Sequence, residues 1–593
     1  MVANHSMNVS SQYIAGTPER CLLSRHSLHS VYYQNPMLSN TFSALLADLD
    51  LSGLPDERSR ALVNGLRNLV ETLAADLRAA QAEIQRLRDE LNHLKGEQGK
   101  PNVKANTPKP SVPDLSSEQE RRQPRERTKR RKHDLLLIDR EQTVRVERTL
   151  LPADAEFKGY DAVLVQDLVV RTDNVLFRKE KFYSPSQQRT YLAELPPGYH
   201  GAFGPGVHAL ALVFAFACQM TEPKILAWFE HVGVQISAGQ ISKLLIKGQE
   251  RFHQEKDAVY EAGLRSGPWQ HIDDTATRVN GQNQHCHIVD NPLHTTYLTQ
   301  PSKARLSVID VLRNGQPRSF RFNEDAEAWL EAAGVSSLMR QKLSRLPRDQ
   351  DLDQETMERL LAEQVPRLGE QTHKWVLDAL AVAAYQAQDE WPVVTLLLSD
   401  GALQFSWITD ESALCWVHEL RHYKKLTPAV ARHRQAVETV LKDAWAFYRD
   451  LLTYREQPSV AEWRRLEARF DEVFGRRTGY WALDERMGMT RAKKANLLMV
   501  LRHPELPLHN NAAELGARQR VRKRAISFGP RTAEGVKAWD TFMSLAATTR
   551  KLGVNFLHYV QDRIAEVKQI PPLADLIAER AKELNLGASW IPA

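Results

Sequence analysis

The stretch PWQHIDDTATRVNGQNQHCHIV, residues 268–289, decides how the central part of the chain folds, because two β-like runs flank Asn280-Gly281. Asn-Gly is the preferred pair for a two-residue type I′ turn, so the stretch predicts a β-hairpin. Successive side chains on a strand face opposite sides of the sheet. Asp273 and Asp274 therefore cannot both point into one site: one is a candidate ligand, and the other is expected at the surface.

A second signal is WPVVTLLLSDG, residues 391–401. This continuous apolar run is typical of a strand buried on both faces. Asp400 follows its carboxyl end, the place where open α/β sheets carry their chemistry. An aspartate after a strand is, however, more often a helix cap or a turn cap, and both interpretations stay open.

The third signal is LPLHNNAAELGARQRVRKRAISFG, residues 506–529, in which Asn510-Asn511 can begin a helix that carries Glu514. Asn511-x-x-Glu514 is also the spacing of a capping box. Five cations crowd the next turns: Arg518, Arg520, Arg522, Lys523 and Arg524. A structural cap does not require these cations. A carboxylate that binds a metal ion next to a DNA backbone does, because cations can bind the phosphates.

Isolated acids on a β-hairpin, a buried strand and a helix together predict a metal site. Hard divalent cations such as Mg²⁺ take carboxylate oxygens and keep several waters and substrate phosphates. Two such ions, roughly 3.5–4 Å apart, activate the attacking oxygen and stabilise the leaving oxygen of an in-line phosphoryl transfer.

The composition fits a chain of several folded domains, since 593 residues are too many for one core. The longest apolar stretch, Val207 to Met220, spans 14 residues and is too short to cross a bilayer. The 4 cysteines are far apart, which excludes a disulfide scaffold and a CxxC zinc ribbon. We therefore expect a protein of the reducing cytoplasm, without a membrane partner.

The N-terminal part of the chain predicts a poorly ordered leader over 1–50 and a coiled coil over 51–96. Apolar residues alternate in steps of three and four from Val63 to Leu94, as in an a/d heptad that favours a parallel homodimer. The alternative is a helix packed on its own globular domain. A polar, Pro-containing linker follows over 97–134, with a basic run from Arg121 to Lys132.

Residues 135–200 predict a β-rich domain, and 201–262 predict a helix-turn-helix region. In the latter, EPKILAWFEHVG is followed by a turn at Val232-Gly233 and by a helix with Ser237 as its N-cap. Gln240 and Lys243 would then lie near the exposed start of the recognition helix. Ordinary helical hairpins have the same pattern, and basic runs are often plain solvated linkers.

Three blocks of the chain resemble the DDE transposases of the insertion sequence 66 family, transposase C type. They are HIDDTATRVNG (271–281), LLLSDG with LCWVHELR (396–401 and 414–421), and LPLHNNAAELGARQRVRKRAISFGPRTAEG (506–535). The resemblance runs through roughly 200–565. It implies a ribonuclease H-like core whose catalytic and metal-binding acids are Asp273, Asp400 and Glu514, with two Mg²⁺ or Mn²⁺ ions. It also implies that His418 and Arg421 lie near the site.

The chain departs from the family pattern in several places. Family members carry a cysteine-rich zinc segment before the helix-turn-helix, whereas 135–200 has no cysteine, so no structural zinc is predicted. Asp274 replaces the usual glutamate. Helical runs near 310–388 and 430–500 are interpreted as insertions in a catalytic core over 263–565, and 566–593 is interpreted as a helical tail.

Taken together, we expect a multidomain α+β protein with an N-terminal coiled coil, a β-rich and helix-turn-helix DNA-binding region and a ribonuclease H-like core. It would cleave transposon ends and join them to target double-stranded DNA at the bacterial nucleoid, as a homodimer and with accessory proteins from the same element. The alternatives are a catalytically inactive DNA-binding scaffold of transposase ancestry and a ribonuclease H-like nuclease without strand transfer. Expected DNA contacts are Arg121, Arg122, Arg130, Arg131, Gln240, Lys243, His418, Arg421, Arg518, Arg522, Lys523 and Arg524.

Overall fold

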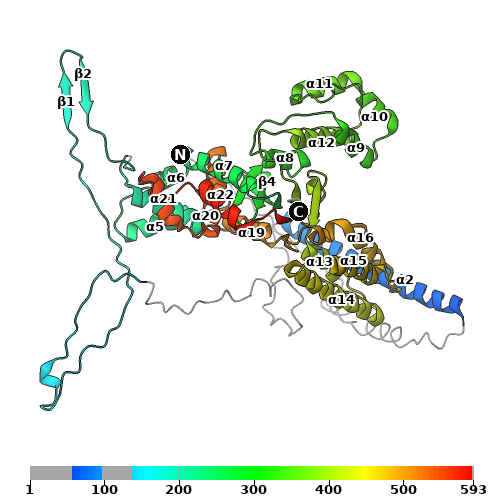
Figure 1. The fold of residues 1–593 in the computed structure, drawn as a ribbon, viewed down its shortest axis with the longest axis horizontal. Helices are drawn as coiled ribbons and strands as arrows, with labels where there is room; N and C mark the ends of the chain where they lie inside the picture. Colours follow the sequence, from blue (N-terminus) through cyan, green and yellow to red (C-terminus); the bar gives the residue numbers. More distant parts are fainter. Residues whose placement is uncertain (1–55, 96–135, 200, 591–593) are drawn as a thin grey trace, which may run out of the picture. The chain divides into compact units, whose positions relative to one another are not determined.

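The computed structural model describes residues 56–95, 136–199 and 201–590 (Figure 1). These residues form two compact units. The first contains the described parts of 1–106 with 425–440 and 477–485, and the second contains the rest of the described chain. No helix within the described ranges is long and apolar enough to cross a membrane.

The first unit is organised by one long helix, α2 (Glu57–Leu94), whose start is capped by Asp56. The side chain of Asn68 donates to the carbonyl of Gly479 at 2.9 Å and accepts from the backbone N–H of Trp481 at 2.9 Å. Glu71 is buried and accepts hydrogen bonds from the backbone N–H groups of Ala429 at 2.7 Å and Val430 at 2.8 Å. The first half of α2 therefore packs on its own chain. This is the alternative to the coiled coil that the sequence left open.

The second half of α2 has a different environment. Its a/d side chains Leu77, Ile84, Leu87, Leu91 and Leu94 are exposed by 49% to 84%, and the stripe extends back to Leu73 and Leu66, exposed by 59% and 50%. A stripe of this kind on a helix surface is the seam by which two helices form a coiled coil. The dimer itself stays a prediction.

The second unit is built on a five-stranded mixed sheet in the order β5-β4-β3-β6-β7. The strands are β3 (Trp269–Val279), β4 (Gln282–Asp290), β5 (Thr295–Gln300), β6 (Leu396–Ser399) and β7 (Glu411–Leu414). β3, β4 and β5 pair antiparallel, whereas β6 runs parallel to both β3 and β7. Asn280 and Gly281 have φ of 48° and 79°, as a type I′ turn requires, so the predicted hairpin is confirmed.

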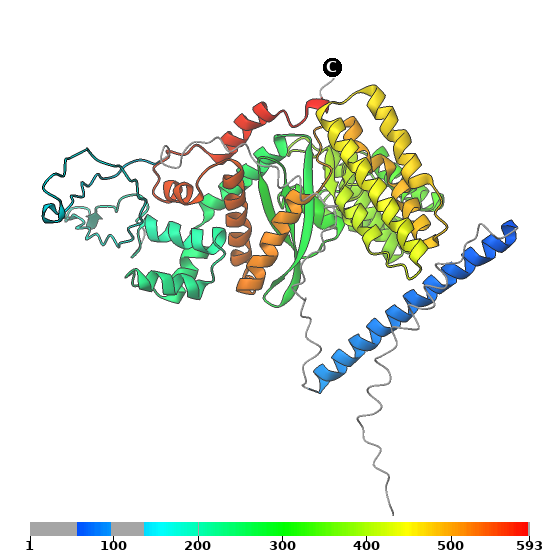
Figure 2. The ribbon, with the colours of Figure 1, turned by 90° about the horizontal axis from the view of Figure 1, so that it is seen from below.

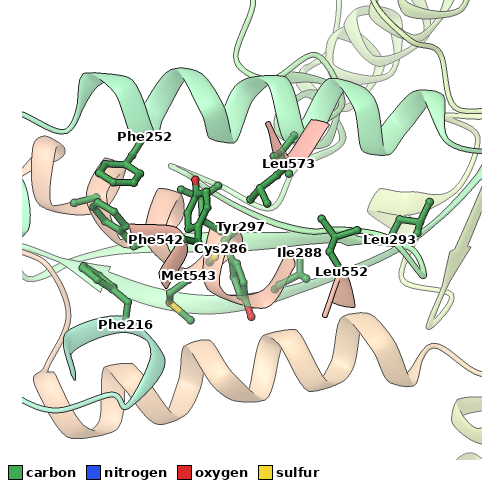
Figure 3. Packing of buried hydrophobic residues seen from close by; sticks show 14 of the residues in the cluster. Phe216, Phe252, Cys286, Ile288, Leu293, Tyr297, Phe542, Met543, Leu552 and Leu573 are labelled. Carbon is green, nitrogen blue, oxygen red and sulfur yellow. The ribbon is translucent and has the colours of Figure 1, made fainter. Parts of the chain in front are cut away.

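Each face of this sheet has its own hydrophobic core. Cys286, Ile288 and Tyr297 pack on the face covered by α19 (Asn511–Ser527) and α20 (Ala533–Lys551), which lie side by side along the strands in Figure 2. Figure 3 shows Phe216, Phe252 and Phe542 clustered at one end of this core. The residues that follow Ile288 and Tyr297 on their strands, Val289 and Leu298, belong to the opposite face, because side chains alternate along a strand.

The opposite face is covered by helices that lie between β5 and β6 in the sequence. They are α8 (Arg305–Leu312), α9 (Glu324–Ala332), α10 (Ser337–Leu343), α11 (Gln354–Gln364) and α12 (Glu370–Ala387). Val308 and Leu380 are fully buried in one core with Ile272 and Val289 of the sheet. The expected insertion near 310–388 is therefore continuous with the core of the sheet.

The helices that precede the sheet include the predicted two-helix pair. They are α4 (Pro205–Leu212), continued by η4 (Val213–Ala217), then α5 (Glu222–His231), α6 (Ala238–Ile246) and α7 (Glu250–Arg265). Gly233 has φ of 83° in the turn after α5, and Ser237 caps α6 by accepting from the N–H of Gln240 at 3.3 Å. The two helices and their turn are thus present, and their role in DNA recognition stays a prediction.

The remaining helices follow β7. They are α13 (Trp416–Lys424), α14 (Ala431–Glu456), α15 (Val460–Gly475), α16 (Trp481–Ala492), α17 (Lys494–Leu497), α18 (Met499–Arg502), α21 (Phe556–Ile564) and α22 (Leu573–Leu584), with a final turn η6 (Ala588–Trp590). The expected C-terminal tail is helical and docked, because Leu573 and Ile577 are fully buried and pack in the core that contains α7. The indole N–H of Trp269, at the start of β3, donates to the carbonyl of Leu586 at 2.7 Å.

The expectation of a β-rich domain over 135–200 is wrong for most of that stretch. Residues 136–199 contain one short turn, η3 (Arg148–Leu150), and one hairpin of β1 (Lys181–Ser184) and β2 (Arg189–Leu192). The apolar side chains between them stay exposed, for example Val165 at 77% and Val169 at 81%. Strand propensity is realised only when a pleated surface finds a partner to pack on, and these residues have none within the described chain.

Candidate active site

Asp273 lies on the face of the sheet that α19 covers. Trp269 packs in the core of that face and Ile272 in the core of the other, so alternation along β3 directs Asp273 toward α19 and Asp274 away from it. Burial is the largest influence on Asp273 and, with the negative charges of Asp400 and Glu514, raises its pKa to about 7. The carboxylate is thus close enough to two other acids to resist ionisation.

Asp400 follows β6, the strand next to β3. The parallel register pairs Trp269 with Leu396 and His271 with Leu398, and the same register carried two residues further brings Asp273 level with Asp400. One carboxylate oxygen of Asp400, Oδ1, accepts from the backbone N–H of Ala402 at 2.9 Å and so closes the turn. The other, Oδ2, lies 4.0 Å from Nε2 of His418. Asp400 is therefore a turn cap, and its second oxygen is directed toward the histidine that pairs with Glu514.

Glu514 lies in the first turn of α19, and its side chain does not close that helix. The N-cap of α19 is Asn510, which makes no side-chain capping bond, so the capping-box alternative does not hold. Glu514 Oε1 instead lies 3.3 Å from Nδ1 of His418, and Oε2 lies 3.3 Å from both Arg421 and Arg518. Burial acts to raise the pKa of Glu514, but the hydrogen bond with His418 and the charge of Arg421 outweigh it and lower the pKa to about 2.

His418 joins the second and third acids. It is the one side chain that the structure places within 4.0 Å of both Asp400 and Glu514 among the ion pairs of the described residues. A hydrogen bond with Cys415 and, next, the bond with Glu514 raise the pKa of His418 to about 10. These distances place His418 and Arg421 beside Glu514, and their role in the site stays a prediction.

Asn510 ties the elements of the site together, a role that the sequence did not reveal. It is fully buried, and its Nδ2 donates to the carbonyl of Ile272 at 2.8 Å, while its Oδ1 lies 2.9 Å from Nδ1 of His271. Its backbone N–H donates to Sγ of Cys415 at 3.2 Å. One residue thus links β3, the start of α13 and the start of α19. The Asn-Asn pair before an acid-bearing helix was the only signal in the sequence.

Cys415 adds a second set of metal-ligand atoms. The sulfur of Cys415, a ring nitrogen of His418 and a carboxylate oxygen of Glu514 lie within 4.8 Å of one another and could hold a metal ion. Thiolate and imidazole suit zinc, whereas the carboxylates of Asp273, Asp400 and Glu514 suit magnesium or manganese. Because both sets use Glu514, they cannot be treated as independent sites.

Asp274 is not the surface group that we expected. Its Oδ2 accepts from Nε2 of Gln404 at 2.7 Å, and its Oδ1 lies 3.9 Å from Nδ1 of His285. The side chain of Asp274 is only 15% exposed. Asp274 lies with Gln404 and His285 on the face of the sheet opposite Asp273. The helices between β5 and β6 and the segment after β6 cover that face and shield the side chain from solvent.

The five cations after Glu514 do not form one basic surface. Arg520 is fully buried and pairs with Asp540 at 3.1 Å. Lys523 is also buried, its ammonium 4.9 Å from the ring centroid of Trp539, and burial lowers its pKa to about 8. The expectation that Lys523 contacts DNA is therefore wrong: positions three apart share a helix face, and this face of α19 is turned to the core.

The other expected DNA contacts have mixed outcomes. Arg518 and Arg522 are exposed, and Arg524 donates to the carbonyl of Ala276 on β3. Lys243 is exposed on α6, and Gln240 is half-buried. Arg121, Arg122, Arg130 and Arg131 lie outside the described residues.

Comparison with known proteins identifies a family for part of the chain. Residues 395–538, which include Asp400 and Glu514, match the family described as "Transposase IS66 family". The chain is 33% identical over 335 residues to uncharacterized protein y4jO of Sinorhizobium fredii (strain NBRC 101917 / NGR234). The alignment covers 54% of this chain and 100% of that relative. No solved structure matches the chain significantly. The chain belongs to the IS66 family of transposases.

Proposed function

We propose that this protein is a metal-dependent DNA transposase that cleaves transposon ends and joins them to target double-stranded DNA. The observation that carries the proposal is that Asp400 and Glu514 both lie within 4.0 Å of His418, while Asp273, on the strand parallel to β6, feels the negative charge of both acids. The mixed sheet with acids at adjacent strand positions supports a ribonuclease H-like core. Family membership supports the substrate class.

The donor set fits two hard divalent cations. Asp273 has a pKa of about 7 because burial and two neighbouring acids disfavour its charge, and a cation relieves that repulsion. Magnesium or manganese, when bound, supplies the charge that activates the attacking oxygen and stabilises the leaving oxygen in an in-line phosphoryl transfer. Asp273, Asp400 and Glu514 would hold the ions.

The surrounding residues of this chain position those acids. Asn510 fixes β3 against the start of α19, so the backbone that carries Asp273 is tied to the helix that carries Glu514. Arg421 and Arg518, both partly exposed beside Glu514, supply positive charge where DNA phosphates would approach. The exposed a/d stripe of α2 supports a homodimer, which would bring two transposon ends together.

The test is a nicking and strand-transfer assay on a labelled transposon end with Mg²⁺ or Mn²⁺. Asp273→Asn, Asp400→Asn and Glu514→Gln should each reduce both reactions to background, whereas Asp351→Asn, in an exposed ion pair with Arg321, should not. Near-full activity in any one of the three removes that residue from the site. Wild-type protein that binds DNA but never nicks it across a metal titration would instead identify a non-catalytic scaffold, and nicking without joining would identify a nuclease.

A further inference from the structure

A cavity of about 760 Å³ lies on the face of the sheet to which Asp274 points. Its walls include Trp329 of α9, Trp375 of α12 and Trp407 of the segment that follows η5 (Leu403–Phe405). His285 of β4 and Gln404 also line it. Pockets of roughly 300–1,000 Å³ hold small organic ligands, so this one has room for a nucleotide.

Aromatic rings line the cavity, and one of them, Trp407, is held by a strained backbone conformation. The rings of Trp329 and Trp407 meet edge to face, with centroids 5.4 Å apart, and the guanidinium of Arg305 lies 5.2 Å from the Trp329 ring. Trp407 is 44% exposed and has φ of 67°, in the left-handed region that bulky residues rarely adopt. Strained backbone of this kind clusters at ligand-binding sites. The indole Nε1 of Trp329 is buried without a hydrogen-bond partner among the described residues.

The charges around the cavity favour an anion. Lys303 and Lys374 line it and are exposed, while Arg305 is held by Asp378 at 2.7 Å. A second cavity of about 580 Å³ shares Trp329 and Trp407 but has an acidic lining of Asp325, Asp410 and Glu411 beside Arg502. The two cavities therefore differ in sign, and an anionic ligand would enter the one with the two lysines.

The basic cavity is linked to the acids of the active site through adjacent residues of β3. Asp273 faces α19, and its neighbour Asp274 is held by Gln404, which lines the cavity. Leu403 and Gln404 follow Asp400 closely in the sequence. Asp273 and Asp274 face opposite sides of the sheet, so the cavity is separate from the acids of the active site and is joined to them only through the backbone of β3 and the segment after Asp400.

We propose that this cavity binds one unpaired nucleotide of the DNA substrate, with its base stacked on the exposed ring of Trp407 and its phosphate near Lys303 and Lys374. Aromatic platforms flanked by cations bind single-stranded DNA in this way with little sequence preference, because every base has a π-face. The helices between β5 and β6 would then supply one wall of a nucleotide site on the face of the sheet opposite the acids. The inference rests on the proposed function, since DNA must be the substrate.

The experiment uses the full chain with EDTA, so that no cleavage occurs, and two fluorescein-labelled probes: single-stranded oligothymidylate and an abasic oligomer of the same length. Wild-type protein should bind the thymidylate roughly 5- to 100-fold more tightly than the abasic oligomer, the range that stacking of a base supports. Trp407→Leu should lose this preference, while Trp407→Phe, which keeps a ring on the same backbone, should retain it. Trp481→Leu, at a tryptophan exposed by 61% elsewhere in the chain, should behave as wild type.

Equal affinity of wild-type protein for the two probes, or an undiminished preference in Trp407→Leu, overturns the nucleotide cavity. Either result can occur while metal-dependent nicking of a transposon end persists, in which case the proposed function stands without the cavity. Conversely, Asp273→Asn should lose nicking but keep the preference for the thymidylate probe over the abasic probe. A preference that disappears equally in Trp407→Leu and Trp407→Phe also contradicts the inference, because it indicates a disturbed fold rather than a lost ring.

Discussion

Asn510→Ala should separate the strand that carries Asp273 from the helix that carries Glu514. The substitution removes the donor to the Ile272 carbonyl and the partner of His271 Nδ1, both of which are buried. Burial lowers the pKa of His271 to about 4, so its ring is neutral and donates from Nδ1 to the Asn510 oxygen. A buried polar group left without a partner costs about 1–3 kcal/mol. Two such groups predict a loss of about 2–6 kcal/mol.

The loss should be local, so it is measured by hydrogen exchange on peptides that cover β3 and the start of α19. Opening free energies differ from region to region of a native protein, and a chain of two units need not unfold in one step. Asn496→Ala is the matched control: Asn496 is half-buried and its side chain makes one hydrogen bond, to the Ser412 carbonyl at 3.1 Å, so we expect about 1 kcal/mol. Exchange protection within about 0.5 kcal/mol of wild type in Asn510→Ala would falsify the bridging role.

Three further results follow from the packing. Glu71→Ala should destabilise the first unit by about 2–6 kcal/mol, since it leaves two buried backbone amides without their charged partner, and hydrogen exchange on peptides that cover α2 and 425–440 measures this. Ile84→Asp combined with Leu91→Asp should convert a dimer to a monomer in sedimentation analysis, because both side chains are about half exposed on the α2 stripe, and a monomeric wild type would contradict the coiled coil. Burial lowers the pKa of Lys523 from 10.5 to about 8, so the unfolded chain binds more protons between these values and stability should rise with pH in that window. Lys523→Met should abolish that rise and leave DNA affinity unchanged, whereas Arg522→Ala should weaken DNA binding in a salt-dependent way.

Local patterns predicted the elements that carry the acids. The Asn280-Gly281 pair specified the hairpin because few residues tolerate two consecutive positive φ values. The run before Asp400 specified a buried central strand because its side chains are apolar on both faces. Ser237 specified the start of α6 because its hydroxyl accepts a free backbone N–H. Each of these signals acts over a few residues, so the linear sequence contains all of it.

Predictions failed where the outcome depended on which partner a residue meets. Lys523 looks like its exposed neighbour Arg522 in the sequence, yet it packs on Trp539 because α19 turns that face to the core. Residues 136–199 have strand-like composition but form one short hairpin, because no second surface covers the rest. Asn68 and Glu71 of α2 pack on other parts of the chain, whereas Leu77 to Leu94 stay exposed, although one heptad pattern runs through the helix.

The order of residues was enough to name either Asp273 or Asp274, together with Asp400 and Glu514, as candidates, since turn chemistry, strand burial and helix starts are short-range properties. The family resemblance then selected Asp273. Their assembly depends on contacts between segments far apart in the chain: the parallel register of β3 with β6, the bridge of Asn510 to β3, and the placement of His418 between two acids. The same long-range packing directs Asp274 to the opposite face and forms the tryptophan-lined cavity there. Such contacts arise when apolar surfaces of distant elements exclude water together, a condition that no short segment can meet alone.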